Sequence, residues 1–448
     1  PTTLIEGVRL LDPGTALIVD RDGSCRFHRF WEMPLHEFGH RSGNSSVGAL
    51  HEALSESVRR QLVSDVPLGA FLSGGIDSSV VVGLAQKHLD HPLRTFTLAF
   101  EEPAYSEARY AKAVSDAFGT DHQEVMLTRT EFERGLPDVM ESLDQPSFDG
   151  ANTFFVSRAA RELGLTVALA GTGGDEIFGG YSSFTQLGKV RFLRHLTGLV
   201  PNRALCLVKR MALWADGLRR RGFPHQGSIG KAITLLNRRG DLLHIYQTMY
   251  RIFLEETVAA LVQDYDTSLT PDGLDPELSE YLSERTAGRT DLAALSFLEL
   301  HNYLGNRLLR DTDAMSMAVS LEVRLPLIDY QLFETVAQLD GHTRFEPVGR
   351  KRCLLEAASL PLPIEVVKRG KKGFVLPMDF WLRDTLRKET GEILLDPQLC
   401  RRAGLRPEAV AALWEQFTRG DAGLYWSRIW ALYVLLKWCA KHDAAVAS

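Results

Sequence analysis

The sequence has no apolar run long enough to cross a membrane. A spanning helix needs roughly 20 mostly apolar residues, whereas the longest candidate, Ile429 to Leu436, is much shorter and lies between Arg428 and Lys437. We expect it to form a buried C-terminal helix. The N-terminal residues do not have the charged and apolar pattern of a secretory signal. Because the chain opens on Pro1 rather than Met, we also expect the natural start to lie upstream.

Cysteine is scarce, and neither sign of charge dominates. The five cysteines are widely scattered and form no Cys-x-x-Cys pair, which argues against a disulfide framework and a zinc site. The formal net charge of −6 is small for 448 residues, so composition argues against wholesale binding to nucleic acid or to a membrane surface. These features predict a cytoplasmic globular protein whose length suits two or three domains.

A glycine-rich turn at residues 73–78 follows an apolar segment that we expect to be a buried strand, and it opens a helix. Bare backbone N–H groups at a helix N-terminus bind anions, and glycine lets the backbone approach them closely. The candidate phosphate-binding residues are Ser73, Gly74, Gly75 and Ser78. A carboxylate among phosphates requires a cation between them, so Asp77 is predicted to bind Mg²⁺. The alternative is a plain turn with a Ser/Asp helix cap.

Two common nucleotide motifs are absent from this turn. It lacks the Gly-Lys-Ser/Thr ending of the γ-phosphate loop and the Gly-x-Gly-x-x-Gly of dinucleotide folds. The string Ser73-Gly74-Gly75-Ile76-Asp77-Ser78 instead resembles the PP-loop of the ATP pyrophosphatases, which hold the pyrophosphate that leaves when a substrate is adenylated.

Strands and helices are expected to alternate after this turn, which predicts a parallel sheet covered on both faces. The expected helices are 79–89, 106–118, 131–143 and 153–163, and the expected strands are 93–100, 124–127 and 166–170. The last strand runs into a second glycine-rich turn, Gly171 to Glu176. Ligands of open α/β sheets bind beyond the carboxyl ends of strands, so Asp77 and Asp175 are predicted to share a divalent metal.

The second half of the sequence is mostly helical in pattern. Residues 189–239 contain twelve Lys and Arg against one acid, Asp216. This basic segment could bind RNA or a carrier protein; the alternative is a solvated helical face. We expect helices over 242–262 and 292–326, the latter with embedded charges that must be paired or face a site. The basic loop 368–374 could place a lysine where charge develops on a nucleotide.

Five motifs, in order, resemble the synthetase half of the class II glutamine amidotransferases, the asparagine synthase family, over residues 46–440. They are residues 73–78, Ser106-Glu107-Ala108, residues 173–181, residues 316–329 and Lys371-Lys372-Gly373-Phe374. The resemblance implies four parts: a remnant of the N-terminal glutaminase domain (1–45), a PP-loop core (46–188), a basic helical insertion (189–291) and a helical C-terminal part (292–448). The nucleophilic cysteine of the glutaminase domain has no counterpart here, so we expect no glutamine hydrolysis by this chain.

The resemblance also implies roles for single residues. Adenine would lie against the backbone at Leu72 and near Thr97 and Leu98, with Gly171, Thr172 and Gly173 on the facing turn. Lys371 matches the lysine that stabilises charge during adenylation and amide formation. Lys351 resembles a second lysine of the family, which lies near the pyrophosphate. Glu322 matches an acid that assists the attack of ammonia.

The implied reaction is that of a carbon–nitrogen ligase: aspartate or a related carboxylate, ATP with Mg²⁺, and ammonia give an amide, AMP and pyrophosphate. In the full-length parent, glutamine would supply the ammonia. The chain departs from the family at Thr172, where asparagine synthetases carry Glu. The open alternatives are an RNA-modifying PP-loop enzyme, a β-lactam synthetase-like ligase or another natural-product or glycan amide ligase, and a non-catalytic relative. A homodimer is compatible with the resemblance.

Overall fold

The fold centres on a five-stranded sheet in strand order β5-β4-β3-β6-β7 with every neighbouring pair parallel. The computed structural model describes residues 3–34, 44–197, 207, 210, 211, 214, 223, 226–235, 242–265, 273–421 and 423–443. The strands are β3 (Leu68–Phe71), β4 (Arg94–Phe100), β5 (Asp121–Leu127), β6 (Val167–Leu169) and β7 (Glu322–Arg324). The predicted α/β class with a parallel sheet is confirmed.

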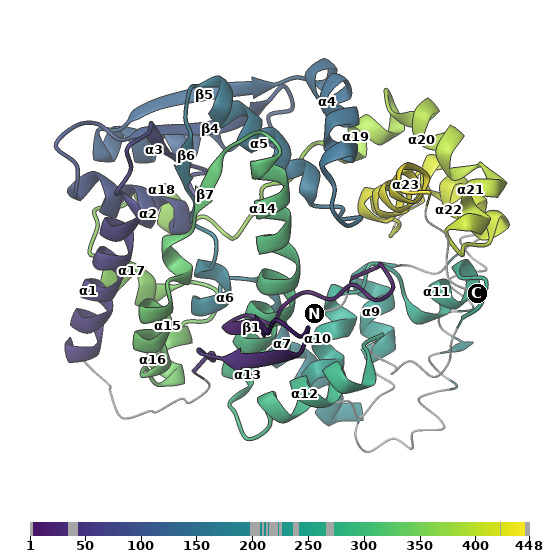
Figure 1. Ribbon diagram of the computed structural model, residues 1–448, viewed down its shortest axis with the longest axis horizontal. Helices are drawn as coiled ribbons and strands as arrows, with labels where there is room; N and C mark the ends of the chain where they lie inside the picture. The colour runs from purple at the N-terminus through teal and green to yellow at the C-terminus, as the bar shows by residue number, and fades with distance from the viewer. Residues whose placement is uncertain are drawn as a thin grey trace.

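Helices connect the strands as the sequence pattern predicted, with ends that differ by a few residues. They are α2 (Ile76–Lys87), α3 (Ala108–Phe118), α4 (Arg129–Ser142) and α5 (Gly150–Glu162), and α1 (Asn44–Gln61) precedes the first strand of the sheet. Thr128 begins α4 with a capping box, accepting the N–H of Glu131 while the Glu131 carboxylate accepts the N–H of Thr128. Figure 1 shows helices on both faces of the sheet.

Alternating side chains of the strands enter two hydrophobic cores, one on each face of the sheet. Phe96, Leu98 and Phe100 of β4 join a core with α4, α5 and the C-terminal helices. Ala70 of β3 and Leu169 of β6 join the other, with α1 and α2. Successive side chains of a strand point to opposite faces of the sheet, so the strands contribute to both cores. The polar residues of the two glycine turns lie at the ends of the strands.

The helix predicted over residues 292–326 is wrong at its C-terminal end. The chain forms α13 (Asp291–Leu298), the π-helix η1 (Glu299–Leu308) and α14 (Leu309–Met317), and then strand β7. Ser320 takes a left-handed conformation with φ of 58°, which ends the helix. Residues 322–324 then pair with β6. Pairing with a strand more than 150 residues away in the chain overrides the local helical pattern.

The other described elements are mainly helices. They are α6 (Gly174–Phe178), α7 (Ser182–Thr197), α9 (Ser228–Leu235), α10 (Leu242–Tyr250), α11 (Glu255–Leu261), α12 (Pro276–Thr286), the 3-10 helix η2 (Pro326–Ile328), α15 (Tyr330–Ala337), α16 (Gly341–Phe345), α17 (Arg352–Ala358), α18 (Ile364–Lys368), α19 (Met378–Arg383), α20 (Arg387–Leu394), α21 (Pro397–Arg402), α22 (Pro407–Thr418) and α23 (Trp426–Lys441). The tract expected over 242–262 is thus two helices. Most of the basic segment 189–239 lies outside the described residues.

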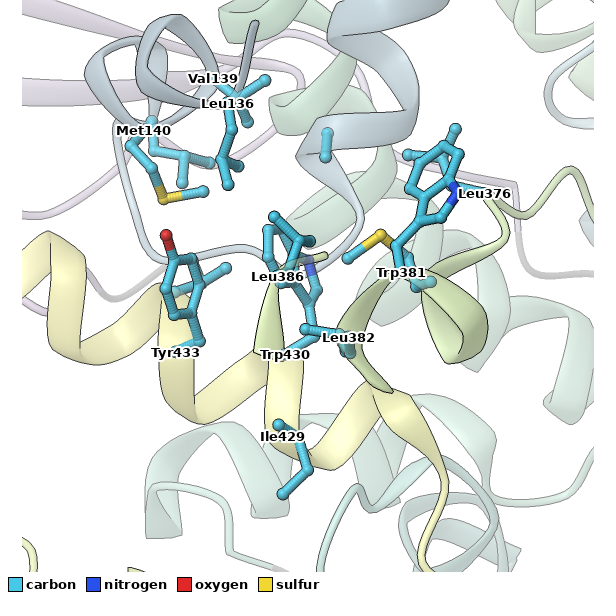
Figure 2. Packing of buried hydrophobic residues seen from close by; sticks show 14 of the residues in the cluster. Leu136, Val139, Met140, Leu376, Trp381, Leu382, Leu386, Ile429, Trp430 and Tyr433 are labelled. Carbon is cyan, nitrogen blue, oxygen red and sulfur yellow. The ribbon is translucent and has the colours of Figure 1, made fainter. Parts of the chain in front are cut away.

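The C-terminal helix α23 is buried, as predicted. Its Ile429, Trp430 and Tyr433 pack against Leu136 and Val139 of α4 and against side chains around α19 (Figure 2). This apolar contact anchors the C-terminal helices to the sheet. Within the described part of the chain, no helix combines the length and the hydropathy that crossing a membrane would require.

The N-terminal residues form an antiparallel hairpin of β1 (Thr15–Val19) and β2 (Cys25–Arg29). In Figure 1 it lies in front of the helices around α13 and apart from the parallel sheet. Trp31 reaches the remainder of the protein, where its indole N–H donates to Glu334 at 3.3 Å. The four proposed parts of the chain stay predictions.

Candidate active site

The first glycine turn lies between the end of β3 and the start of α2. Gly75 is the N-cap of α2, and Gly74 has a φ of 66°. A Cβ at Gly74 would lie 2.4 Å from the Cβ of Tyr110, so only glycine fits there. The Ser73 and Ser78 hydroxyls are 3.1 Å apart, and Ser73 Oγ accepts the N–H of Gly75. The turn therefore presents hydroxyls and amides beside a helix N-terminus.

The second glycine turn touches the first because β6 is the neighbour of β3. A Cβ at Gly171 would lie 2.5 Å from the backbone nitrogen of Ser78, and one at Gly174 would lie 2.3 Å from Oδ1 of Asp77. Gly173 has a φ of 106° and begins α6. The glycines thus allow two backbones to approach so closely that Asp77 and Asp175 share one site.

Two lysines join the aspartates at this point. The Lys351 Nζ lies 2.5 Å from Asp77 Oδ2 and 2.5 Å from Asp175 Oδ1. Lys371 donates to the other oxygen of Asp175. The Lys351 side chain is 5% exposed and that of Lys371 is 38% exposed, so one ammonium is buried and the other faces solvent. Four residues that lie far apart in the sequence form one charge cluster.

Burial and pairing act in opposite directions on these groups. Burial raises the pKa of the Asp77 carboxyl, and the nearby Asp175 raises it further against the pull of Lys351. Burial also acts to raise the pKa of Asp175, but Lys351 and Lys371 outweigh it and lower that pKa. Burial acts to lower the pKa of Lys351, and the two aspartates raise it overall. The lysines therefore outweigh burial at Asp175, whereas burial outweighs them at Asp77.

The aspartates have the chemistry to hold a divalent cation. Asp77 Oδ1 is buried without a hydrogen-bond partner among the described residues, so it retains an oxygen for a further ligand. Over the same residues, no group of three or more His, Cys, Asp or Glu forms a metal site. Two carboxylates suit Mg²⁺, which binds one or two of them together with substrate phosphates.

The predicted adenine-binding residues lie beside the PP-loop. The N–H of Leu72 donates to the carbonyl of Phe96 at 2.9 Å, which extends the β3–β4 pairing to the residue before Ser73. Thr97 and Leu98 follow Phe96 in β4 and are buried. Thr172 lies between Gly171 and Gly173 on the facing turn and is half-buried. The structure thus brings all these residues to the carboxyl edge of β3, β4 and β6.

Glu322 does not join this group. It begins β7 opposite Val167, the first residue of β6, whereas the candidate site follows the last residue of β6. Its side chain is 56% exposed and pairs with Arg324 at 2.7 Å. Its predicted part in ammonia attack is corrected accordingly: parallel pairing places Glu322 at the opposite end of the sheet.

Arg369 and Glu107 connect the loops around the site, and the sequence did not single them out as functional residues. Arg369 pairs with the buried Glu107 and donates to the carbonyl of Ser73 at 3.4 Å. Its guanidinium lies 4.3 Å from the ring centroid of Tyr110, the residue that contacts Gly74. The basic loop 368–374 and the motif Ser106-Glu107-Ala108 were both visible in the sequence, but their pairing was not.

A second set of buried acids lies behind the charge cluster. Glu176 Oε1 accepts the Tyr181 hydroxyl at 2.8 Å, and Glu299 accepts those of Ser183 and Tyr250 at 2.6 Å each. The Tyr303 ring lies 5.5 Å from that of Tyr181 and 5.2 Å from that of Tyr250. Burial raises the pKa of Glu176 to about 7 and that of Glu299 to about 8.

Comparison with known proteins agrees with this geometry. The family model described as asparagine synthase matches residues 49–440, most of the chain. The chain belongs to the asparagine synthase family. Both glycine turns lie within the matched region, as do Lys351 and Lys371.

Several asparagine synthetases are similar to the chain, among them three from Bacillus subtilis and Escherichia coli. Asparagine synthetase [glutamine-hydrolyzing] 1 of Bacillus subtilis is 28% identical over 442 residues, 98% of the chain and 66% of that protein. Asparagine synthetase [glutamine-hydrolyzing] 3 of the same organism is 26% identical over 83% of the chain and 55% of its own length. Asparagine synthetase B [glutamine-hydrolyzing] of Escherichia coli is 28% identical over 41% of the chain and 36% of its own length. The chain thus spans less than two thirds of these relatives.

Proposed function

We propose that this chain forms amides from ATP, a carboxylic acid and ammonia through an acyl-adenylate. The observation that carries the proposal is the charge cluster at the carboxyl edge of adjacent strands: Asp77 and Asp175 with Lys351 and Lys371, beside the PP-loop. Membership of the asparagine synthase family supports the same chemistry.

The first step needs charge stabilisation rather than a strong nucleophile. An oxygen of the acceptor carboxylate attacks the α-phosphorus of ATP, and the bond from that phosphorus to the bridging oxygen of pyrophosphate breaks. The amides and hydroxyls of residues 73–78 bind the departing pyrophosphate. Asp77 and Asp175 would hold Mg²⁺, which neutralises phosphate charge when bound. Lys351 and Lys371 add positive charge where negative charge develops.

The second step replaces AMP by nitrogen. Ammonia attacks the acyl carbon, the bond from that carbon to the AMP oxygen breaks, and the nitrogen loses one proton. Lys371 is the exposed lysine of the cluster, so it can approach a bound acyl-adenylate and stabilise the oxyanion. We propose no part for Glu322 in this step.

The acceptor acid is the part of the reaction that Thr172 leaves open. Thr172 stands on the turn that faces the PP-loop, and a hydroxyl cannot act as a general base near neutral pH as a carboxylate does. We therefore propose aspartate, or a related carboxylate such as a sugar acid or a peptide side chain, as the acceptor. An internal amine, as in β-lactam formation, is the alternative nucleophile.

The test combines product analysis with isotope transfer. The chain is incubated with ATP, Mg²⁺, ammonium and a panel of acids whose carboxylates carry ¹⁸O. We expect AMP and pyrophosphate in equal amounts, with one ¹⁸O atom in AMP for each amide formed. Formation of ADP, transfer of ¹⁸O to inorganic phosphate, or no nucleotide turnover with any acid contradicts the proposal. A salt-sensitive shift of tRNA with modified-base formation would favour the RNA-modifying alternative.

A further inference from the structure

The buried ammonium of Lys351 lies where a cation would bridge the two aspartates. Its Nζ is 2.5 Å from one carboxylate oxygen of Asp77 and 2.5 Å from one of Asp175. Lys371 holds the second oxygen of Asp175. Three of the four carboxylate oxygens are therefore paired with lysines, and Asp77 Oδ1 is not. Asp77 Oδ1 and Asp175 Oδ1 are both buried without a hydrogen-bond partner among the described residues.

The backbone around Lys351 holds this arrangement in place. Lys351 has a left-handed backbone with a φ of 49° and is the N-cap of α17, whose Leu355 N–H donates to the Lys351 carbonyl at 3.1 Å. A Cβ at Gly180 would lie 2.0 Å from both Lys351 Cε and Asp175 Oδ1. The chain thus keeps glycine at the point where the lysine and the aspartate meet.

The charge balance of the cluster disfavours binding of a cation alone. Two aspartates and two lysines form a neutral set, and a divalent cation that entered alone would add two positive charges to it. The Lys351 ammonium would then lose its partners while it stayed buried, which is costly. A polyphosphate that enters with the cation offers new oxygens to the lysines and cancels the added charge.

We propose that Lys351 competes with a free divalent cation for Asp77 and Asp175, so that the cation binds together with the nucleotide and not before it. This inference rests on the proposed function for its nucleotide. Lys371 adds to the competition through the other oxygen of Asp175. Binding of cation and of nucleotide is then strongly and reciprocally coupled.

The test measures binding of Mn²⁺ alone, by the loss of its free electron paramagnetic resonance signal, with and without α,β-methylene-ATP. The wild type binds Mn²⁺ alone at least about tenfold more weakly than with the nucleotide. Lys351→Met binds Mn²⁺ alone about tenfold more tightly than the wild type does, because the competing charge is gone. The coupling factor between Mn²⁺ and nucleotide falls accordingly.

The matched control is Lys372→Met. It removes a lysine next to Lys371 whose ammonium donates to the carbonyl of Ala104 and contacts neither aspartate. Its affinity for Mn²⁺ alone stays at the wild-type value. If Lys351→Met binds Mn²⁺ alone no more tightly than this control, the competition is refuted.

Two further measurements keep the proposal testable if Lys351→Met does not fold. Lys371→Met, which changes a half-exposed side chain, gives a smaller tightening of Mn²⁺. The wild type gains melting temperature from MgCl₂ only when nucleotide is present, and a saturable gain from MgCl₂ alone overturns the proposal. Failure of the proposed function is a separate outcome, seen as absence of any nucleotide effect on melting in any variant.

Discussion

Two buried acidic clusters lie side by side in this protein and are held in opposite ways. The aspartate pair, Asp77 and Asp175, is paired with two ammonium groups. The glutamate pair, Glu176 and Glu299, is surrounded by tyrosine and serine hydroxyls. Asp175 and Glu176 are adjacent in α6, yet the pKa of Asp175 is lowered and that of Glu176 is raised to about 7.

The contrast between Asp175 and Glu176 shows that neighbouring groups decide the direction of the pKa shift when two adjacent carboxyls are both buried. Burial is the first cause of the shift for both residues and acts to raise both pKa values. Only Asp175 has lysines close enough to reverse it, whereas hydroxyl donors lower the pKa of Glu176 too little. Asp175 therefore stays charged at the carboxyl edge of the sheet, whereas Glu176 favours the protonated form behind it.

Removing a lysine from the aspartate pair gives the largest expected effect. Lys371→Met should lower the rate of AMP formation by about 10²- to 10³-fold, the loss typical of one donor that stabilises developing charge. Its side chain is 38% exposed, so the protein should still fold. The rate of AMP release with ammonium and a reactive acid measures the effect, and Lys372→Met is the control. A wild-type rate for Lys371→Met would remove this lysine from the mechanism.

Replacing one carboxylate of each pair by an amide should lower the free energy of unfolding by different amounts. Asp175→Asn should lower the free energy of unfolding by about 3 kcal/mol, because the buried Lys351 loses one of its partners. Glu176→Gln should change it by less than about 1 kcal/mol at pH 6, where a neutral amide replaces a largely neutral acid. Urea denaturation at pH 6 measures both values. Equal losses would contradict the assignment of opposite charge states.

The close packing of Asp175 and Lys351 against Gly180 can be tested by a substitution that changes no charge. Gly180→Ala places a methyl group 2.0 Å from Asp175 Oδ1 and from Lys351 Cε, and should cost about 2 kcal/mol of stability. Gly188→Ala is the matched control, because its methyl group meets no atom within 4 Å and alanine favours helix α7. Thermal melts of the two variants measure the difference. A Gly180→Ala protein as stable as the control would mean that the ion pair is loosely held.

The glutamate pair should give an effect that is spread over pH, seen as a dependence of the free energy of unfolding on pH. Glu299 has an ordinary pKa of 4.5 and a pKa of about 8 in the folded protein. Between these values the folded protein retains a proton that the unfolded chain releases, so stability falls as pH rises. The slope from one such group is at most about 1.4 kcal/mol per pH unit.

Glu299→Gln should abolish this contribution, and its stability should fall less than that of the wild type between pH 5 and pH 8. Urea denaturation across that range measures the two slopes. Because Glu176 is present in both proteins, the difference between their slopes reports Glu299 together with its interaction with Glu176. Parallel slopes would show that Glu299 is ionised throughout that range.

The sequence predicted the architecture well because each signal was local. Alternating apolar strands and helices predicted the parallel sheet, and β4, α3 and α5 lie within a few residues of their expected positions. Glycine turns after two strands predicted that Asp77 and Asp175 would meet, since adjacent parallel strands end at the same edge. The buried C-terminal helix followed from its apolar composition.

One site prediction failed and one contact was not predicted, because the deciding contacts join distant parts of the chain. Glu322 was assigned to the site, but β7 pairs with β6 in a register that places it at the opposite end. The pairing of Glu107 with Arg369 joins residues more than 250 positions apart. A periodic pattern contains no information on such partners, because it reports only which side of an element is apolar.

The sequence by itself determined the two glycine turns and the asparagine synthase family, because short motifs fix backbone conformation and close approach. Only the tertiary structure decided that Lys351 would bridge Asp77 and Asp175, and that Glu176 would be separated from them among hydroxyls. The physical reason is that the charge of a buried carboxyl depends on neighbours supplied by other elements, and packing of the whole chain selects those neighbours.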